Sequence, residues 1–495
     1  MIPYADFTYF GLLLYAVVPT LILGLFGKAG WRWATLVTAA MLIVQYHGLL
    51  HVRPHFAVRE IWIVIGFAVW QWVTVWVFAK SGARAGWPFY VAVAASLLPL
   101  AASKLFPVTS PRSEFGFLGI SYITFRGLDV VFCLRDKVIA LPGTLDFSMY
   151  LFFFPTISAG PIDRFQRFAG EWRKRRTRAE FLIDLDGAVH RIFRGFFYKF
   201  ILAALIKQYW LERAASSGSF AALVSYMYAY SFYLFFDFAG YSAFAIALSY
   251  LFGVHTPENF DRPFLARDIR DFWNRWHITL SFWFRDHVYM RFLYAAMRGK
   301  WFAHKEIAPI AGYFLAFGLM GLWHGPELHY IAYGFYQAVL LSGFHIFSRW
   351  SKVHRYWRDG LVSRVVGTFI TFQFVCFGLL IFSGRIGAAP LPHFVSKIEH
   401  ADCTAISGWI WDKNDVDAEV HIELWDRDQY VMAFTANHYR EDLVNAGYGN
   451  GRHGFKIPTP PQLRDHRPHV IHLRVAGTKQ ELTGSSGVIR CQQSK

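Results

Sequence analysis

The sequence predicts an α-helical polytopic membrane protein with an all-β domain at its C-terminal end. Of its 495 residues, 55% are hydrophobic and 17% are charged, whereas soluble domains carry about 25% charged residues. The apolar residues gather in stretches that approach or reach the roughly 20 residues needed to cross a bilayer. After residue 394 the pattern changes to short alternating segments. We expect about ten or eleven membrane helices plus re-entrant segments, followed by a small β-sandwich.

The membrane segments follow one another from the N-terminus. We expect the first, 9–27, to be a retained helix and not a signal peptide, because it lacks a basic n-region and a clear cleavage site. The segment 152–168 is interrupted by Pro155, Gly160 and Pro161, which favours a broken, re-entrant segment. The other apolar stretches lie at 33–46, 61–79, 88–102, 115–134, 188–206, 219–252, 307–323, 328–347 and 362–383.

The formal net charge of +16 indicates the excess of Lys and Arg on cytoplasmic loops and not a nucleic-acid surface. The basic runs 164–181, 255–291 and 349–359 are therefore expected on the cytoplasmic side of a cell membrane. A basic face there would suit an acidic protein partner. If 349–359 is cytoplasmic, segment 362–383 crosses outward and the residues that follow 394 are extracytoplasmic.

The C-terminal region differs in its residue pattern. Apolar residues alternate at 419–425 and 469–475, as in half-buried strands, and turn sequences separate these runs. We expect a membrane body at 1–385, a Gly-, Ala- and Pro-rich linker at 386–393 and a small β-sandwich module at 394–495.

Four cysteines, Cys133, Cys376, Cys403 and Cys491, show no metal-ligand spacing, so no metal site is expected. Cys403 lies in the first strand candidate of the module and Cys491 in the last. An extracytoplasmic module is in an oxidising environment. We therefore hypothesise a Cys403–Cys491 disulfide; the alternative is two unpaired thiols.

Polar residues inside apolar segments are candidates for a functional site because burying them is costly. His324 follows a long apolar stretch, and Gly321, Gly325 and Pro326 break the helix around it. A single histidine in such a stretch is more often structural, but the break favours a cavity-lining or catalytic role. Asp237, in the apolar run 233–253, should be neutral or paired with a base, and structural pairing is its simpler role.

The stretch 271–291, "DFWNRWHITLSFWFRDHVYMR", holds His277 among aromatic and basic residues. If it is helical, Trp273 and His277 share one face with Leu280 and Phe284. The stretch is short and basic for a membrane crossing, so an interfacial or re-entrant helix explains its arginines and aromatics. That interpretation does not explain the histidine.

Several of these sequences together carry a family resemblance. "FDFAGYSAFAIALSYLFG", "NFDRPFLARDIRDFWNRWHITLSFWFRDHVYM" and "GLWHG" resemble successive signatures of the membrane-bound O-acyltransferase family. The opening 28 residues, "GISYITFRGLDVVFCLRD" and "FFPTISAGPIDRF" resemble its D-alanyl-transfer branch. The resemblance covers about residues 1–385 and implies transfer of an acyl group onto a hydroxyl through a tunnel in the membrane.

The resemblance also implies roles for residues. His324 matches the family's invariant histidine and would be the general base, while His277 would orient or polarise the thioester. The aromatic wall of Trp273, Trp276 and Trp323, with Asp237, would line the passage for a phosphopantetheine arm. Arg270, Arg275 and Arg285 would receive an acidic acyl carrier protein on the cytoplasmic face. No bound cofactor is implied, because the carrier's phosphopantetheine thioester is the donor.

The C-terminal module departs from the D-alanyl branch. It resembles, more weakly, a β-module found beside bacterial glycosyltransferases and polysaccharide enzymes, so the acceptor is teichoic acid or another surface glycan or glycolipid. Two alternatives stay open: an O-acetyltransferase of an exopolysaccharide, and a glycolipid transporter or flippase. No inverted repeat is visible between the halves of the body, which counts against a transporter.

Overall fold

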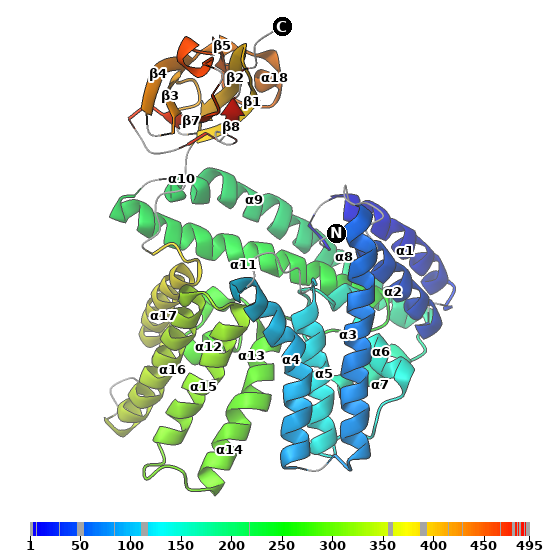
Figure 1. Ribbon diagram of the computed structural model, residues 1–495. Coiled ribbons are helices and arrows are strands. Elements are labelled where there is room, and N and C mark those ends of the chain that lie inside the picture. The colour runs from blue at the N-terminus through cyan, green and yellow to red at the C-terminus, as the bar shows by residue number, and fades with distance from the viewer. Residues whose placement is uncertain are drawn as a thin grey trace. The chain divides into compact units, whose positions relative to one another are not determined.

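The computed structural model shows two compact units (Figure 1). The first comprises Met1–Tyr209 with Tyr226–Ala388, and the second Trp210–Ser225 with Ala389–Lys495. The structure describes the chain except residues 1–2, 6, 29, 47–53, 84, 110–116, 217, 355–359, 387–393, 414, 428, 466, 478–480, 483, 485–486, 490 and 492–495, and except the side chains of 54–60, 105–109 and 354. The expected linker 386–393 therefore lies almost wholly outside the described residues.

The helical unit follows the apolar pattern of the sequence. Its N-terminal helices are α1 (Phe7–Leu25), α2 (Trp31–Tyr46), α3 (Pro54–Lys80), α4 (Trp87–Thr109), α5 (Ile120–Arg135), α6 (Thr144–Phe152), α7 (Phe165–Trp172) and α8 (Arg178–Phe196). α8 continues through the π-helical turns η2 (Phe197–Ala203) and η3 (Lys207–Leu211), with α9 (Ala204–Ile206) between them; α10 (Glu212–Ala215), which follows, belongs to the second unit. The rest are α11 (Phe220–Leu251), α12 (Ile269–Trp273), α13 (Ile278–Phe284), α14 (Met290–Arg298), α15 (Ile307–His324), α16 (Leu328–His354) and α17 (Leu361–Phe382).

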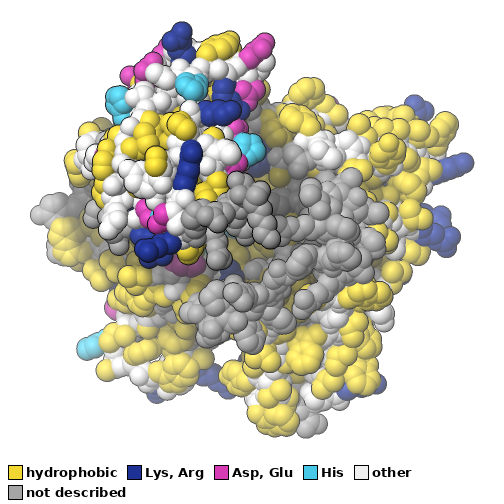
Figure 2. Space-filling model, turned by 45° about the horizontal axis from the view of Figure 1, so that its top comes forward, with side chains coloured by type: hydrophobic (Ala, Val, Ile, Leu, Met, Phe, Trp, Pro, Cys, Tyr) yellow, Lys and Arg dark blue, Asp and Glu magenta, His cyan; other side chains and the backbone are white. Residues whose placement is uncertain are grey.

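Five of the described helices are long and apolar enough to cross a membrane: α1, α3 from Ile61, α11, α15 and α17. The other expected segments also form helices, but α2 and α5 have only 16 residues each, fewer than the roughly 20 that span a bilayer. In Figure 2 hydrophobic side chains are frequent among the described residues around the periphery of the helical unit. A helical membrane protein with a C-terminal β-region is confirmed.

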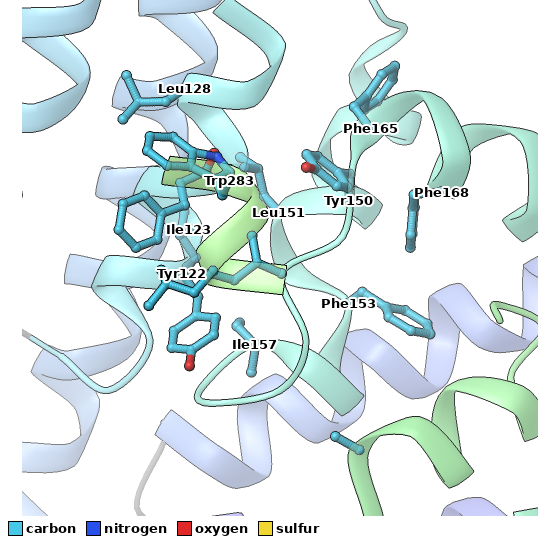
Figure 3. Close-up of a cluster of buried hydrophobic side chains, with 14 of the residues drawn as sticks. Tyr122, Ile123, Leu128, Tyr150, Leu151, Phe153, Ile157, Phe165, Phe168 and Trp283 are labelled. Atoms are coloured by element: carbon cyan, nitrogen blue, oxygen red, sulfur yellow. The ribbon is translucent and has the colours of Figure 1, made fainter. Parts of the chain in front are cut away.

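The predicted interruption at 152–168 is present, and Arg126 of α5 holds it by hydrogen bonds to its backbone. α6 ends at Phe152, a single 3₁₀ turn follows at Phe154–Thr156 (η1), and the chain stays irregular until α7. The guanidinium of Arg126, which is 1% exposed, donates to the carbonyls of Tyr150, Leu151 and Thr156 at 2.9–3.0 Å. Figure 3 shows the aromatic and aliphatic side chains that pack around this break. One buried arginine thus satisfies carbonyls that the broken helix leaves unpaired.

A second buried cluster joins three elements of the helical unit. Asp129 of α5 is fully buried and accepts hydrogen bonds from Arg164 and His287, each at 2.9 Å. Arg164 precedes α7 and also donates to Asp286 at 2.9 Å. His287 and Asp286 belong to the π-helical turn η5 (Arg285–Tyr289) that follows α13. The cluster therefore fixes α13 and η5 against the broken segment.

The C-terminal region forms two antiparallel four-stranded sheets, in the orders β1-β2-β6-β5 and β4-β3-β7-β8. The strands are β1 (Phe394–Ala401), β2 (Ala405–Asp412), β3 (Val420–Asp426), β4 (Gln429–Ala436), β5 (His438–Tyr439), β6 (Arg452–Pro458), β7 (His469–Val475) and β8 (Gly487–Ile489), with the short helix α18 (Glu441–Asn445). Buried side chains on β2, β3 and β7, among them Ile406, Ile422 and Leu473, form its core.

The Cys403–Cys491 disulfide is confirmed. Its surroundings differ from the expected ones: Cys403 lies in the turn between β1 and β2, and Cys491 lies just beyond β8. β1 and β8 are edge strands of different sheets and are not hydrogen-bonded neighbours. The disulfide therefore links the two sheets of the region.

Candidate active site

His324 is the last residue of α15, where the helix stops before α16 begins at Leu328. The two helices approach closely at Gly321 and Gly334: a Cβ at Gly321 would lie 2.6 Å from the carbonyl oxygen of Tyr330. The backbone carbonyl of His324 accepts a hydrogen bond from Lys104 Nζ at 3.1 Å. The close contact at the two glycines and the hydrogen bond from Lys104 together fix the end of α15. They therefore also fix the position of the His324 imidazole.

His277 lies at a break between two short helices. The stretch is not one continuous helix, because α12 ends at Trp273 and α13 begins at Ile278, so the shared helical face that continuity would give is not formed. His277 adopts φ 43° and ψ 51°, a left-handed conformation that is unusual for a residue with a side chain. Such strained residues persist only where the surroundings hold them, and they gather at functional sites.

Asn259 holds His277 in this conformation. Its backbone carbonyl accepts from Ile278 N at 3.0 Å, and its side-chain Oδ1 lies 3.1 Å from His277 Nδ1. Asn259 Oδ1 also accepts from Thr279 Oγ1 at 2.9 Å, while its Nδ2 donates to Ser242 Oγ at 3.3 Å. Because the amide oxygen faces the ring, Nδ1 of His277 carries the proton and Nε2 is the acceptor.

His277 and His324 come from different elements, and His324 lies close enough to influence His277 electrostatically. Burial, and after it the electrostatic influence of His324, lower the pKa of His277 to about 3. His277 is therefore a neutral imidazole at physiological pH, with an unprotonated Nε2. A neutral ring in this tautomer can accept a hydrogen bond but cannot donate one from Nε2. The geometry thus favours orienting a substrate over polarising a carbonyl.

A cavity of about 310 Å³ lies beside this region. It is lined by Trp273 of α12, by Phe317 and Met320 of α15, and by Arg270 and Arg285. The indole of Trp273 packs on Phe317 with ring centroids 4.8 Å apart and donates to Gln337 Oε1 at 3.2 Å. The cavity therefore combines an aromatic wall with two exposed guanidinium groups.

The remaining predicted site residues lie outside this cavity. Arg275 is held by Asp271 at 2.8 Å and by Asp261 at 3.7 Å. Trp276 packs among Phe260 and Phe272, and Trp323 packs against Phe125 at 5.6 Å. Asp237 forms an ion pair with Lys199, the structural pairing that its apolar surroundings require. Asn259 and Lys104 were not predicted from the sequence, where an asparagine before "FDRPF" and a lysine in an apolar helix such as α4 have no distinguishing pattern.

Residues 30–383 match the model of the MBOAT, membrane-bound O-acyltransferase, family. The chain belongs to the membrane-bound O-acyltransferase family. It is 40% identical to the teichoic acid D-alanyltransferase of Bacillus subtilis (strain 168) over 397 residues, which cover 78% of this chain and 98% of the relative. The corresponding enzyme of Streptococcus thermophilus (strain ATCC BAA-250 / LMG 18311) is 37% identical over 77% of this chain and 95% of its own length.

A more distant match is the "probable alginate O-acetylase AlgI" of Pseudomonas aeruginosa (strain PAO1), 31% identical over 54% of this chain and 48% of that protein. The protein is thus an O-acyltransferase, and the transporter alternative does not hold. The family match ends at residue 383, so the β-region of this acyltransferase lies outside it.

Proposed function

We propose that this acyltransferase moves a D-alanyl group from the phosphopantetheine thioester of an acyl carrier protein onto a hydroxyl of teichoic acid or a related surface glycan or glycolipid. One structural observation carries the proposal: His324 at the end of α15 lies close enough to the buried His277, before α13, to influence its charge. The similarity to teichoic acid D-alanyltransferases along nearly their whole length supports D-alanyl as the group transferred.

The chemistry requires one base and one positioned donor. The acceptor hydroxyl gives its proton to the imidazole of His324 as its oxygen attacks the thioester carbonyl carbon. The carbon–sulfur bond then breaks, the ester is formed, and the departing thiolate takes the proton from His324. Nε2 of His277 accepts a hydrogen bond from the donor arm and so holds the thioester in line. No covalent acyl-enzyme is needed for this sequence.

The cavity beside Trp273 suits the donor. A pantetheine arm is narrow and uncharged, so the aromatic wall of Trp273 and Phe317 can enclose it. Arg270 and Arg285, exposed at the same cavity, would attract an acidic carrier protein. Placed on the cytoplasmic face by the positive-inside rule, this opening would receive the carrier while the acceptor arrives from the other side.

Transfer by the purified protein in vesicles tests the proposal. With radiolabelled D-alanyl carrier and a teichoic acid acceptor, we expect His324→Ala to lower the rate by about 10²–10⁴-fold, because a general base contributes that much. His345, a histidine on α16, pairs with Glu306 at 3.1 Å. His345→Ala is therefore the control and should retain activity. A His324→Ala variant that folds and keeps more than about a tenth of the rate would overturn the assignment of the base.

O-acetyl transfer onto an exopolysaccharide is the second candidate, favoured by the partial match to the "probable alginate O-acetylase AlgI". The same vesicles supplied with an acetyl donor and an exopolysaccharide distinguish the two. Acetyl transfer that exceeds D-alanyl transfer would replace the first proposal with the second while leaving the role of His324 intact.

A further inference from the structure

Two apolar grooves run along opposite faces of α17. One, of about 850 Å³, lies between α16 and α17; the other, of about 440 Å³, lies beside the 3₁₀ turn η4 (Pro263–Leu265). α17 lines the first with Gly367, Ile370 and Phe374, and the second with Val365, Phe369 and Phe372. Each set repeats at three- or four-residue spacing, so each forms one face of the helix.

The two grooves meet at a pair of arginines. Arg267 and Arg364 line both of them, and Lys352 lines the larger one. Arg364 is in the first turn of α17 and Lys352 in the last turn of α16, so the basic groups gather at one end of the helix pair. Among the described residues that line the larger groove, Asp268 is the acidic one, and its carboxylate accepts the backbone N–H groups of Arg270 and Asp271.

The length of the larger groove matches one leaflet of a bilayer. From Arg364 to Phe374 the chain advances ten residues, which is about 15 Å at 1.5 Å per residue. The hydrocarbon core of a membrane is about 30 Å thick. A molecule anchored at the arginines would therefore reach about the bilayer midplane, as the acyl chains of a phospholipid do.

We infer that this surface binds an anionic phospholipid across α17. Its phosphate contacts Arg267 and Arg364, and one acyl chain lies in each groove. Arginine pairs with phosphate through two parallel N–H···O bonds. This pairing holds the headgroup of the bound lipid in place, whereas lipids of the bulk bilayer exchange freely at a protein surface. Lys352 adds a third positive group for an acidic headgroup. The site is separate from the two histidines and does not depend on the identity of the acyl group or the acceptor.

Native mass spectrometry of the full-length protein in detergent tests the headgroup site. Titrated with phosphatidylglycerol or phosphatidylcholine of the same acyl chains, the protein should retain phosphatidylglycerol at least tenfold more strongly. The double variant Arg267→Gln/Arg364→Gln should bind both lipids alike. Arg298→Gln, which removes an exposed arginine at the end of α14, is the matched control and should bind like wild type.

A second variant tests the groove. Gly343 lines the larger groove, and nothing lies within 4 Å of a Cβ built there, so Gly343→Leu should fold normally and fill the groove. It should weaken retention of phosphatidylglycerol severalfold with the arginines in place, and the lipid-free melting temperature confirms folding. Equal retention of the two lipids by wild type, or unchanged retention by the double arginine variant, would overturn the inference. A lipid-free dimer that Gly343→Leu abolishes would assign the grooves to a second copy of the chain.

Discussion

At the scale of single residues, the candidate site is set by hydrogen bonds that the sequence does not show. His277 could be singled out from the sequence because aromatics and arginines have an interfacial explanation and a histidine does not. Its partner Asn259 could not, because an asparagine in a polar turn usually serves the turn itself. In the structure that asparagine is fully buried and fixes both the backbone and the tautomer of His277.

The first residue-scale prediction concerns this asparagine. Asn259→Ala removes the acceptor for His277 Nδ1–H and for Thr279 Oγ1, so the ring can turn and change tautomer. We expect the turnover number to fall at least about tenfold, as for second-layer partners of functional histidines. Ser242→Ala removes only the 3.3 Å hydrogen bond from the far side of the amide and should have a smaller effect. Transfer rates with saturating donor measure both, and equal rates for wild type and Asn259→Ala would remove Asn259 from the site.

The arginines give a second prediction at this scale. Arg270 and Arg285 line the cavity, where Arg285 also pairs with Asp286 at 2.9 Å, whereas Arg275 lies outside it and pairs with Asp271 and Asp261. Arg270→Glu/Arg285→Glu should therefore weaken binding of a purified acyl carrier protein about tenfold or more and flatten its salt dependence. Arg275→Gln should change binding little.

Binding measured from low to high salt on immobilised acyltransferase separates these outcomes. If Arg275→Gln weakened carrier binding as much as the double reversal, the docking surface would have to be moved towards the 261–275 loop. If neither variant changed carrier binding, the arginines would contact lipid headgroups only.

At the scale of elements, the sequence predicted the helix break that proline and glycine mark and missed one that they do not mark. Pro155, Gly160 and Pro161 correctly marked the irregular segment before α7. The break at residues 274–277 was missed, since "NRWH" contains neither proline nor glycine and its residues are compatible with a helix. Long-range bonds from Asn259 decide the conformation there, and hydrophobic periodicity carries no information about them.

The contact of α15 with α16 yields the element-scale prediction. Gly321 and Gly334 bring the two backbones together next to His324, and a Cβ at Gly321 would meet the carbonyl of Tyr330 at 2.6 Å. Gly321→Val should separate the helices, lower the melting temperature by several degrees and reduce transfer strongly, because overpacking of this kind costs about 1–3 kcal/mol. Gly318→Val on the same helix, where nothing lies within 4 Å of a Cβ, is the control. Similar melting temperatures and activities for the two variants would contradict the packing argument.

At the scale of the whole molecule, composition and residue pattern indicated both parts of the chain, while the topology of the β-region could not be predicted. Period-two alternation at 419–425 and 469–475 gave β3 and β7, but pairing order depends on contacts between distant strands. The reasoning for Cys403 and Cys491 rested on the oxidising side of the membrane, and the bond is present even though β1 and β8 are not neighbours.

The Cys403–Cys491 disulfide allows an experiment to determine on which side of the membrane the β-region lies. A bond that persists implies an oxidising compartment, and the outward crossing of α17 expected from the basic run 349–359 gives the same side. We expect intact cells to react with an impermeant thiol reagent at residues 403 and 491 only after reduction. Replacing Cys133 and Cys376 by serine removes the other two thiols, and Cys403→Ser should make Cys491 reactive without reduction. If the cysteines were labelled only after the inner membrane was permeabilised, the β-region would lie in the cytoplasm. A glycan acceptor outside the cell could then not contact it.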